Sequence, residues 1–271
     1  MPDLMQGKRG LVMGVANDHS IAWGAARTLA AHGAKLAFTY QGDALAKRVK
    51  PLAASAGADL VLPCDVEDIA SLDAVFAEIK RTWGTLDFLV HAIAFSDKTQ
   101  LTGRFADTTR DNFLRTMLIS CFAFVEAATR AAVLMPNGGA MLTLTYNGGD
   151  RAMPNYNAMG PAKAALEASV RYLAVDFGAQ AIRVNAISSG PIRTLAGAGI
   201  GDARMMFAFQ QRHSPLRRGV TLEELGGAAL YLLSDLSTGV TGEIHFVDSG
   251  YNIIAMPHPD ALRADHERGD D

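Results

Sequence analysis

Seven short runs rich in Val, Leu, Ile and Ala alternate with longer amphipathic stretches along this 271-residue sequence. Each run is short enough for a buried strand, and the stretches between the runs have the length and spacing of helices. Such a series is typical of βαβ units, which build a parallel sheet covered by helices on both faces. The sequence therefore predicts an α/β fold with a doubly wound sheet of seven parallel strands.

The boundaries of the expected elements follow from these runs. The strands are expected at residues 10–15, 35–40, 59–65, 86–92, 140–146, 183–188 and 243–248, and the helices at residues 21–31, 43–56, 69–82, 109–133, 161–177, 202–211 and 222–234. No break in composition divides the series, so we expect a single domain over residues 1–257. Within it, residues 195–211 are rich in Gly, Ala and Met and are expected to form a substrate lid, with a flexible surface helix as the alternative. The charged segment 258–271 is expected to be a flexible tail.

Composition and charge exclude several classes of protein. The net charge is −3 and the sequence has no block of Lys and Arg, which argues against a nucleic-acid partner. Its apolar runs are shorter than the roughly 18 residues of a membrane span, and its start lacks a signal-type apolar core, so we predict a cytoplasmic protein without a membrane partner. Cys64 and Cys121 lack the spacing of a zinc site or a disulfide framework, so no metal is expected.

The segment after the first expected strand has the chemistry of a phosphate-binding turn. Gly14 permits a sharp exit from the strand, Ser20 can cap the next helix or donate to a phosphate oxygen, and Gly24 allows close packing of helix on strand. The free amides at the start of that helix carry a partial positive charge that suits a pyrophosphate. The glycine spacing differs from GxGxxG, so an ordinary strand-turn-helix connection stays an alternative.

Residues at the ends of the second and third expected strands suit an adenosine. Gln41 can bond two ribose hydroxyls, and no cation follows it to balance a 2′-phosphate, which favours NADH over NADPH. Asp65 and Val66 can meet an adenine edge, although Asp65 could instead cap the helix that begins near residue 69. His91 lies inside an apolar run and is interpreted as a structural residue whose polar atoms are satisfied.

Tyr156 and Lys163 are the candidate catalytic pair. They are seven residues apart, nearly two helical turns, so one helix can point both side chains the same way. Pro161 is tolerated only in a first turn, so the helix is expected to begin between residues 157 and 160. A phenol near a cation is a strong hydrogen-bond donor to an oxyanion, whereas a packed tyrosine beside a lysine that reaches to solvent is the alternative. After the sixth expected strand, the backbone amide and carbonyl groups of Ile192 can pair with a carboxamide such as that of nicotinamide.

Taken together, these motifs, with Tyr146 and the segment 190–196, resemble the NADH-dependent enoyl-acyl-carrier-protein reductases of bacterial type II fatty-acid synthesis. These enzymes are divergent short-chain dehydrogenases/reductases. The resemblance extends to about Met256, and its discriminating element is the Tyr-x6-Lys spacing, because ordinary members use Tyr-x3-Lys and residue 160 here is glycine. It implies a Rossmann-type sheet, reduction of the trans-2 double bond of an enoyl-acyl-carrier-protein thioester, and a homotetramer.

The resemblance also implies a role for individual residues. Tyr156 would stabilise the enolate oxygen, Lys163 would hold the nicotinamide ribose, and Tyr146 would lie beside the substrate. The implied cofactor contacts are Gly14, Ser20, Ile21, Gln41, Asp65, Val66, Ile93, Lys163, Ile192, Arg193, Thr194, Leu195 and Ala196, and the implied substrate contacts are Ser96, Tyr146, Tyr156, Met159 and Met206. Two other readings stay open, a reductase of carbonyl groups and a non-catalytic NAD-binding regulator.

Overall fold

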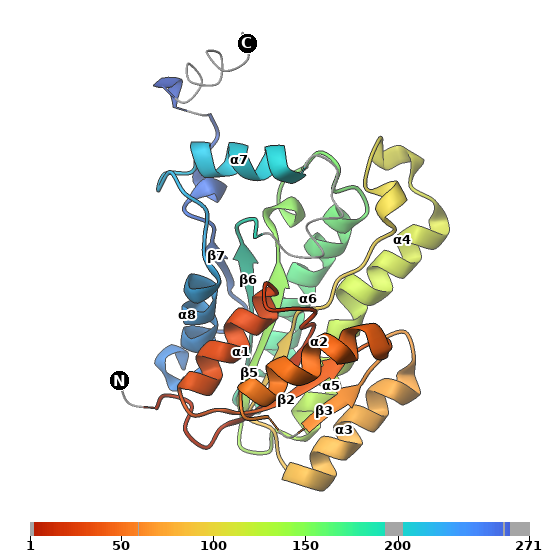
Figure 1. The fold of residues 1–271 in the computed structure, drawn as a ribbon, viewed down its shortest axis with the longest axis vertical. Coiled ribbons are helices and arrows are strands. Elements are labelled where there is room, and N and C mark those ends of the chain that lie inside the picture. The colour runs from red at the N-terminus through yellow and green to blue at the C-terminus, as the bar shows by residue number, and fades with distance from the viewer. Residues whose placement is uncertain (1–2, 59, 193–202, 257, 261–271) are drawn as a thin grey trace.

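Seven parallel strands form one sheet in the order β3-β2-β1-β4-β5-β6-β7 (Figure 1). The computed structural model describes residues 3–58, 60–192, 203–256 and 258–260. The strands are β1 (Arg9–Met13), β2 (Lys35–Tyr40), β3 (Leu60–Pro63), β4 (Phe88–His91), β5 (Gly139–Thr145), β6 (Ile182–Ser189) and β7 (Ile244–Val247). The strand order reverses between β1 and β4, and the crevice at the carboxyl ends of strands beside such a switch is where α/β sheets bind ligands.

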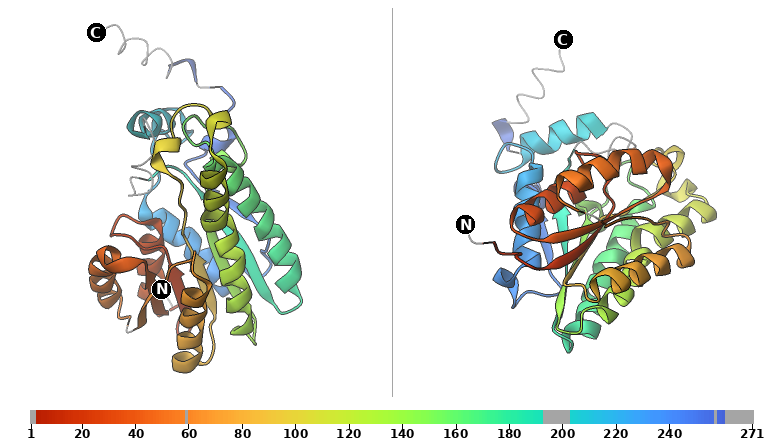
Figure 2. Two further views of the ribbon diagram at one scale, coloured as in Figure 1. Left: turned by 90° about the vertical axis from the view of Figure 1, so that its right-hand side faces the viewer. Right: turned by 60° about the horizontal axis from the view of Figure 1, so that its bottom comes forward.

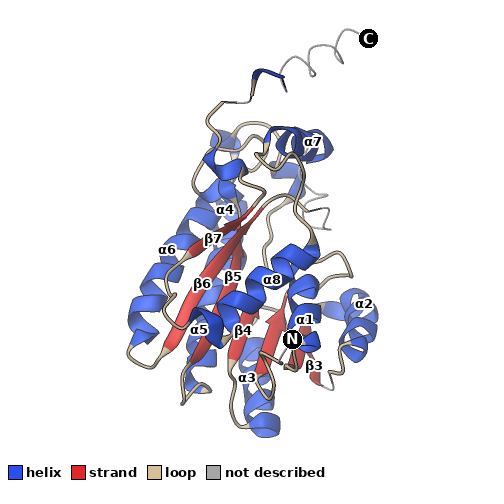
Figure 3. Cartoon of the chain, turned by 90° about the vertical axis from the view of Figure 1, so that its left-hand side faces the viewer, coloured by secondary structure: helices blue, strands red, loops and turns tan. Residues whose placement is uncertain are grey.

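Helices cover both faces of the sheet (Figure 2). On one face pack α1 (Ile21–Ala31), α2 (Gly42–Ser55) and α8 (Leu222–Leu233), and on the other pack α3 (Ile69–Trp83), α5 (Ala123–Val133) and α6 (Met159–Gly178). The helix α4 (Arg110–Met117) leads into α5, and α7 (Ala203–His213) lies across one end of the molecule, beyond the sheet (Figures 1 and 3). The predicted α/β fold is confirmed, and every described strand end, and nearly every helix end, lies within two residues of its expected position.

The helix expected over residues 109–133 is not a regular α-helix. A π-helical turn, η3 (Leu118–Phe122), separates α4 from α5, so the prediction of one uninterrupted α-helix is wrong. By length and composition alone, Arg110–Val133 could cross a membrane, with a hydropathy of 1.4, but 56% of its apolar window is buried inside the protein. Phe124, Ala127 and Ala131 of this stretch are fully buried in the core under the sheet. Its apolar character is therefore that of a core helix.

Gly24 serves a different contact from the expected one. The helices α1 and α8 cross closely, and a Cβ at Gly24 would lie 2.9 Å from the carbonyl oxygen of Leu222 at the start of α8. The close approach is thus between two helices, and the prediction that Gly24 packs its helix on a strand is wrong.

The longest strands, β5 and β6, continue beneath α8 and end near α7 (Figure 3).

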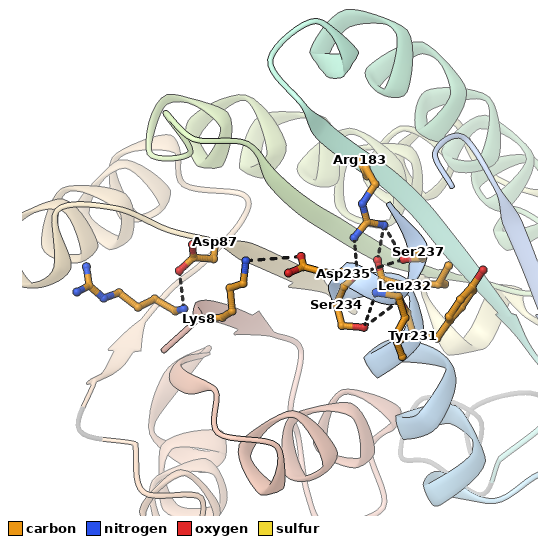
Figure 4. A network of polar contacts seen from close by, with 10 residues as sticks. Lys8, Asp87, Arg183, Tyr231, Leu232, Ser234, Asp235 and Ser237 are labelled. Carbon is orange, nitrogen blue, oxygen red and sulfur yellow. Dashed lines mark hydrogen bonds and ion pairs between the residues drawn. The ribbon is translucent and has the colours of Figure 1, made fainter. Parts of the chain in front are cut away.

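Arg183 of β6 joins the sheet to the carboxyl end of α8 (Figure 4). Its guanidinium donates to the carbonyl oxygens of Leu232 (2.7 Å) and Ser234 (3.0 Å) and to the hydroxyl of Ser237 (2.8 Å). The last carbonyls of a helix lack partners within the helix, and a cation is favourable there. This network fixes α8, and through it α1, against the sheet.

Candidate active site

Two adjoining cavities lie at the carboxyl ends of the strands. The first, of about 320 Å³, is bounded by the turn after β1, the loop after β4, β5, α6 and α7, and the second, of about 300 Å³, by the ends of β2 and β3. They share wall residues from the β1 turn and the β4 loop, among them Gly14 and Ile93, so they form one cleft. A cleft of two lobes across the switch point of the sheet has the shape that a dinucleotide requires.

The expected site residues divide between these lobes. The first cavity is lined by Gly14, Ser20, Ile21, Ile93, Lys163 and Ile192 of the cofactor set and by all five of the substrate set, Ser96, Tyr146, Tyr156, Met159 and Met206. The second is lined by Gln41, Asp65 and Val66, again with Gly14 and Ile93. The predicted contacts Arg193, Thr194, Leu195 and Ala196 lie outside the described residues.

The turn after β1 brings the start of α1 to the first cavity. Gly14 has φ +100°, and a Cβ there would overlap the Ala92 carbonyl oxygen, so both the conformation and the space require glycine. The Ser20 hydroxyl accepts from the amides of Ala16 and Asn17, each at 3.0 Å, and makes no capping bond to α1. Of the two roles expected for Ser20, the capping of the helix is therefore wrong, because this hydroxyl instead holds the turn that precedes the helix.

The adenosine end differs from the expectation in one contact. Asp68, three residues beyond Asp65, caps α3 by accepting from the Ala70 amide at 3.0 Å, so the alternative in which Asp65 is the cap is wrong. Asp65 instead accepts from the Glu67 amide at 3.0 Å and lines the second cavity. Arg115 of α4 forms two 2.7 Å bonds with the Glu67 carboxylate at the rim of this cavity.

Strained backbone on either side of Tyr156 turns its ring toward the cleft. Asn155 and Asn157 have φ values of 59° and 38°, a left-handed conformation that asparagine tolerates better than most residues. The helix α6 then begins at Met159 with Pro161 in its first turn, inside the expected interval. The Tyr156 ring stands edge-on to that of Tyr146, with centroids 5.1 Å apart and planes at 66°.

Burial sets the protonation state of the two central groups. Tyr156 is only 7% exposed, and burial, with smaller contributions from Tyr146 and Glu167, raises the pKa of its phenol far above the usual value. It is therefore a neutral hydrogen-bond donor at neutral pH. Burial lowers the pKa of Lys163 to about 8, while Cys121 and Glu167 oppose this effect. The Lys163 Nζ donates to the Leu144 carbonyl oxygen at 2.7 Å, which leaves further ammonium protons for a ligand.

The substrate end has polar anchors below an apolar wall. The buried Ser96 hydroxyl accepts from Thr116 Oγ1 at 3.0 Å and lies 3.3 Å from the Asn112 side chain. Ser120, in the π turn, both accepts from the Phe95 amide and donates to the Phe95 carbonyl, each at 2.9 Å. One face of α4 and the π turn therefore holds the loop after β4. Above it, Met159, Met206 and Phe207 supply apolar surface.

Two polar contacts of the site could not be found from strand and helix patterns. Gln210 of α7 donates from Nε2 to the Tyr146 hydroxyl at 2.8 Å, and Glu167 of α6 accepts from Thr145 Oγ1 at 2.6 Å. The sequence offers one clue to each residue, its spacing from a predicted site residue. Gln210 is four residues after Met206 and Glu167 is four after Lys163, so each pair lies on one side of its helix. His91 is buried, as a structural residue would be, but neither of its ring nitrogens has a hydrogen-bond partner among the described residues, so the prediction that its polar atoms are satisfied is wrong.

Comparisons with known proteins identify the chemistry. Residues 14–252 match the family described as Enoyl-(Acyl carrier protein) reductase. This chain belongs to that family. It is 72% identical over 263 residues to Enoyl-[acyl-carrier-protein] reductase [NADH] 2 of Rhizobium meliloti, which covers 97% of this chain and 98% of that protein. The activity of this family member is the NADH-dependent reduction of enoyl-acyl-carrier-protein in fatty-acid synthesis.

Solved structures agree with this assignment. The FabI structure from Candidatus Liberibacter asiaticus is 60% identical, with a TM-score of 0.93 and coverage of 95% of this chain and 100% of that one. The reductase of Anaplasma phagocytophilum in complex with NAD is 54% identical, with a TM-score of 0.92 and coverage of 95% and 98%. The family, fold, activity and NADH predictions are confirmed, and neither the carbonyl reductase nor the non-catalytic regulator is supported.

Proposed function

We propose that Tyr156, Tyr146 and Lys163 perform the enoyl reduction at the first cavity, with the substrate thioester between the tyrosines and the apolar side chains of α6 and α7. The observation that carries this proposal is the convergence of two phenols and one ammonium on a single cavity, where the Tyr156 and Lys163 side chains are buried. At a buried side chain, a fixed hydrogen-bond donor stabilises developing charge more strongly than it would in water.

The residues of the cleft fit a dinucleotide. Ser20, Ile21 and Ala22 place the start of α1 on the wall of the first cavity, where helix amides suit a pyrophosphate. Lys163 suits the hydroxyls of the nicotinamide ribose, and Gln41 with Asp65 suits the adenosine in the second cavity. NADH, when bound, supplies the hydride that adds to the substrate β-carbon.

The protein stabilises the charge that this addition creates. Negative charge builds on the thioester oxygen as the double bond is reduced, and Tyr156, neutral and buried, donates a hydrogen bond to that oxygen. Protonation of the α-carbon then gives the saturated thioester. Lys163 acts by positioning, because its bond to the Leu144 carbonyl fixes the ammonium beside the cleft. Ser96 lies in the loop on the thioester side and Met159 and Met206 in the acyl wall.

Removing the Tyr156 hydroxyl tests this assignment. For Tyr156→Phe we expect kcat to fall by a factor on the order of 10² while NADH affinity stays near wild type, because one oxyanion donor contributes about 3 kcal/mol. The assay follows NADH absorbance during reduction of a crotonyl thioester. For Lys163→Ala we expect weaker NADH binding and a lower rate together. Wild-type turnover by Tyr156→Phe would contradict the role of the phenol.

The proposal extends to assembly and domain organisation. Exposed apolar side chains lie on two elements that pack against each other, with Phe122 in the π turn and Tyr172 and Val175 on α6 exposed by 51%, 76% and 80%. Burying them between copies supports a homotetramer, which light scattering of the purified protein tests. Residues 1–257 stay our prediction for a single domain, so removal of residues 258–271 should leave activity intact. The cytoplasmic location also stays a prediction, for cell fractionation to test.

A further inference from the structure

We propose that Glu167 is a positioning residue of this reductase, which fixes the end of β5 beneath Tyr146 and keeps Lys163 charged for NADH binding. This inference rests on the function proposed for Lys163. It concerns a carboxyl group that is not itself part of the cavity wall but bonds Thr145, which is, and that takes no part in the reaction described above.

The first observation is that α6 holds β5 at two consecutive residues. Lys163 donates to the Leu144 carbonyl oxygen at 2.7 Å, and Glu167 accepts from the Thr145 hydroxyl at 2.6 Å. Lys163 and Glu167 are one helical turn apart and therefore point to the same side of α6. The next residue of the chain is Tyr146, so its ring is carried by a strand end that is fixed on both preceding residues.

The second observation is the packing of the turn that follows Tyr146. A Cβ at Gly149 would lie 2.8 Å from Glu167 Oε1 and 3.0 Å from the Ala164 amide nitrogen, so the turn η4 (Asn147–Gly149) rests directly on this carboxyl group. Glu167 thus contacts the chain on both sides of Tyr146. Loss of its bond to Thr145 would free the strand end and the turn together.

The third observation concerns charge. Lys163 is 6% exposed, and the ionisable groups that interact with it are His91 from β4, Cys121 from the π turn and Glu167 from its own helix, while Tyr156 lines the same cavity. His91 is neutral, because burial lowers its pKa to about 3. Cys121 and Glu167 both favour the ammonium form of Lys163, but burial raises the pKa of the Cys121 thiol above its usual value, so Glu167 is the carboxyl group that can carry a negative charge there.

The surroundings of Glu167 act on its pKa in both directions, and the net effect is a pKa above the usual value of a glutamate. Burial raises the pKa of this carboxyl group, the Thr145 hydrogen bond and then Arg171 lower it, Asp150 raises it, and Lys163 lowers it. Arg171 is one turn further along α6, and Asp150 follows the turn η4. A carboxylate that accepts a short hydrogen bond and lies one turn from an ammonium raises the pKa of that ammonium.

The sign of the effect on NADH binding follows. Lys163 binds the ribose as an ammonium, so NADH affinity should decline as the pH rises through about 8, where this group loses its proton. Glu167→Gln keeps the shape and an acceptor for Thr145 but removes the charge. The decline should then begin at lower pH. We expect equal NADH affinity for both proteins at about pH 6 and weaker binding by the variant at about pH 9, because the variant's ammonium loses its proton at lower pH.

The experiment measures NADH affinity by fluorescence titration from about pH 6 to about pH 10, with circular dichroism to verify folding. Thr145→Val removes the hydrogen bond but keeps the charge, so we expect a lower kcat with the wild-type pH midpoint. Glu167→Asp keeps the negative charge on a shorter side chain, so we expect its pH midpoint to lie between those of Glu167→Gln and wild type. Glu78→Gln is the matched control, because Glu78 also accepts from a threonine, Thr82 at 3.1 Å, on α3.

The proposal would be overturned if the pH midpoint of NADH binding were the same for Glu167→Gln as for wild type. It would also be overturned if Thr145→Val shifted that midpoint as much as Glu167→Gln does, because the shift would then come from movement of the strand and not from the lost charge. Lys163→Ala separates this failure from failure of the proposed function. If that variant binds NADH normally and wild-type affinity is flat across the range, the role of Lys163 itself is wrong. If the NADH affinities of wild type and of Glu167→Gln decline at the same pH, only the role of Glu167 is wrong.

Discussion

Replacing Gly148 with alanine would move the Tyr156 ring without removing its hydroxyl. Gly148 lies in the turn after β5, and an added Cβ would be 2.5 Å from Tyr156 Cδ1, 2.7 Å from Cε1 and 3.3 Å from Tyr146 Cδ1. Carbon atoms in contact are normally about 3.5 to 4.0 Å apart. The Tyr156 ring, or the turn, must therefore shift by about 1 Å to admit one methyl group.

A shift of that size has a calculable consequence for catalysis. Misplacing a catalytic group by about 1 Å can reduce the rate on the order of 100-fold, which corresponds to about 2.7 kcal/mol of lost transition-state stabilisation. We expect Gly148→Ala to lower kcat for a crotonyl thioester by a factor of this order. NADH affinity should change little, because the added methyl group meets the tyrosine rings and not Lys163.

The control is Gly227→Ala in α8, where a Cβ would have no neighbour within 4 Å. This variant should keep full activity and gain a little stability, since alanine favours a helix over glycine by about 1 kcal/mol. Wild-type kcat in a folded Gly148→Ala protein would refute the reasoning, because it would show that the position of the Tyr156 ring does not limit the reaction.

Two further substitutions test contacts that fix the site and the fold. Gln210→Met should lower kcat several-fold in the wild-type background and have little effect in Tyr146→Phe, because Gln210 acts through the Tyr146 hydroxyl. A double-mutant cycle measures this coupling, and equal losses of kcat in both backgrounds would argue against it. Arg183→Met should lower the free energy of unfolding by about 3 kcal/mol, since it removes a charged donor from several partly buried acceptors at the end of α8. Denaturant unfolding measures this change, and an unchanged midpoint would contradict it.

The parts of the fold that the sequence predicted well are those that local pattern determines. Buried parallel strands are short apolar runs, and each expected strand end lies within two residues of the described one. Pro161 limited the start of α6 correctly because its ring excludes it from a helix interior. Tyr156 lies three residues before α6 and Lys163 in its second turn, and both line the same cavity, although their spacing alone left a packed tyrosine as an alternative.

The errors arise where tertiary contacts decide. Asp65 and Asp68 are both suitable caps, and only the path of the chain selects Asp68. Ser20 has the right position for a cap, but its hydroxyl is taken by the amides of the preceding turn. Gly24 and Gln210 act through α8 and Tyr146, partners far away in sequence. A periodicity argument cannot name such partners, because it describes one element at a time.

The π turn between α4 and α5 limits how the length of this segment can vary. A π turn contains one residue more than the α-helical turn it replaces, so deleting one residue from Leu118–Phe122 would leave a regular α-helix. The π turn spreads this extra residue over nearly the same rotation as an α-helical turn, so the deletion would keep α4 and α5 in phase. Phe124 would stay in the core, whereas Ser120, which lies inside the shortened turn, would lose its bonds to Phe95. The extra residue therefore serves the loop on the substrate side, while the packing of α5 under the sheet does not depend on it.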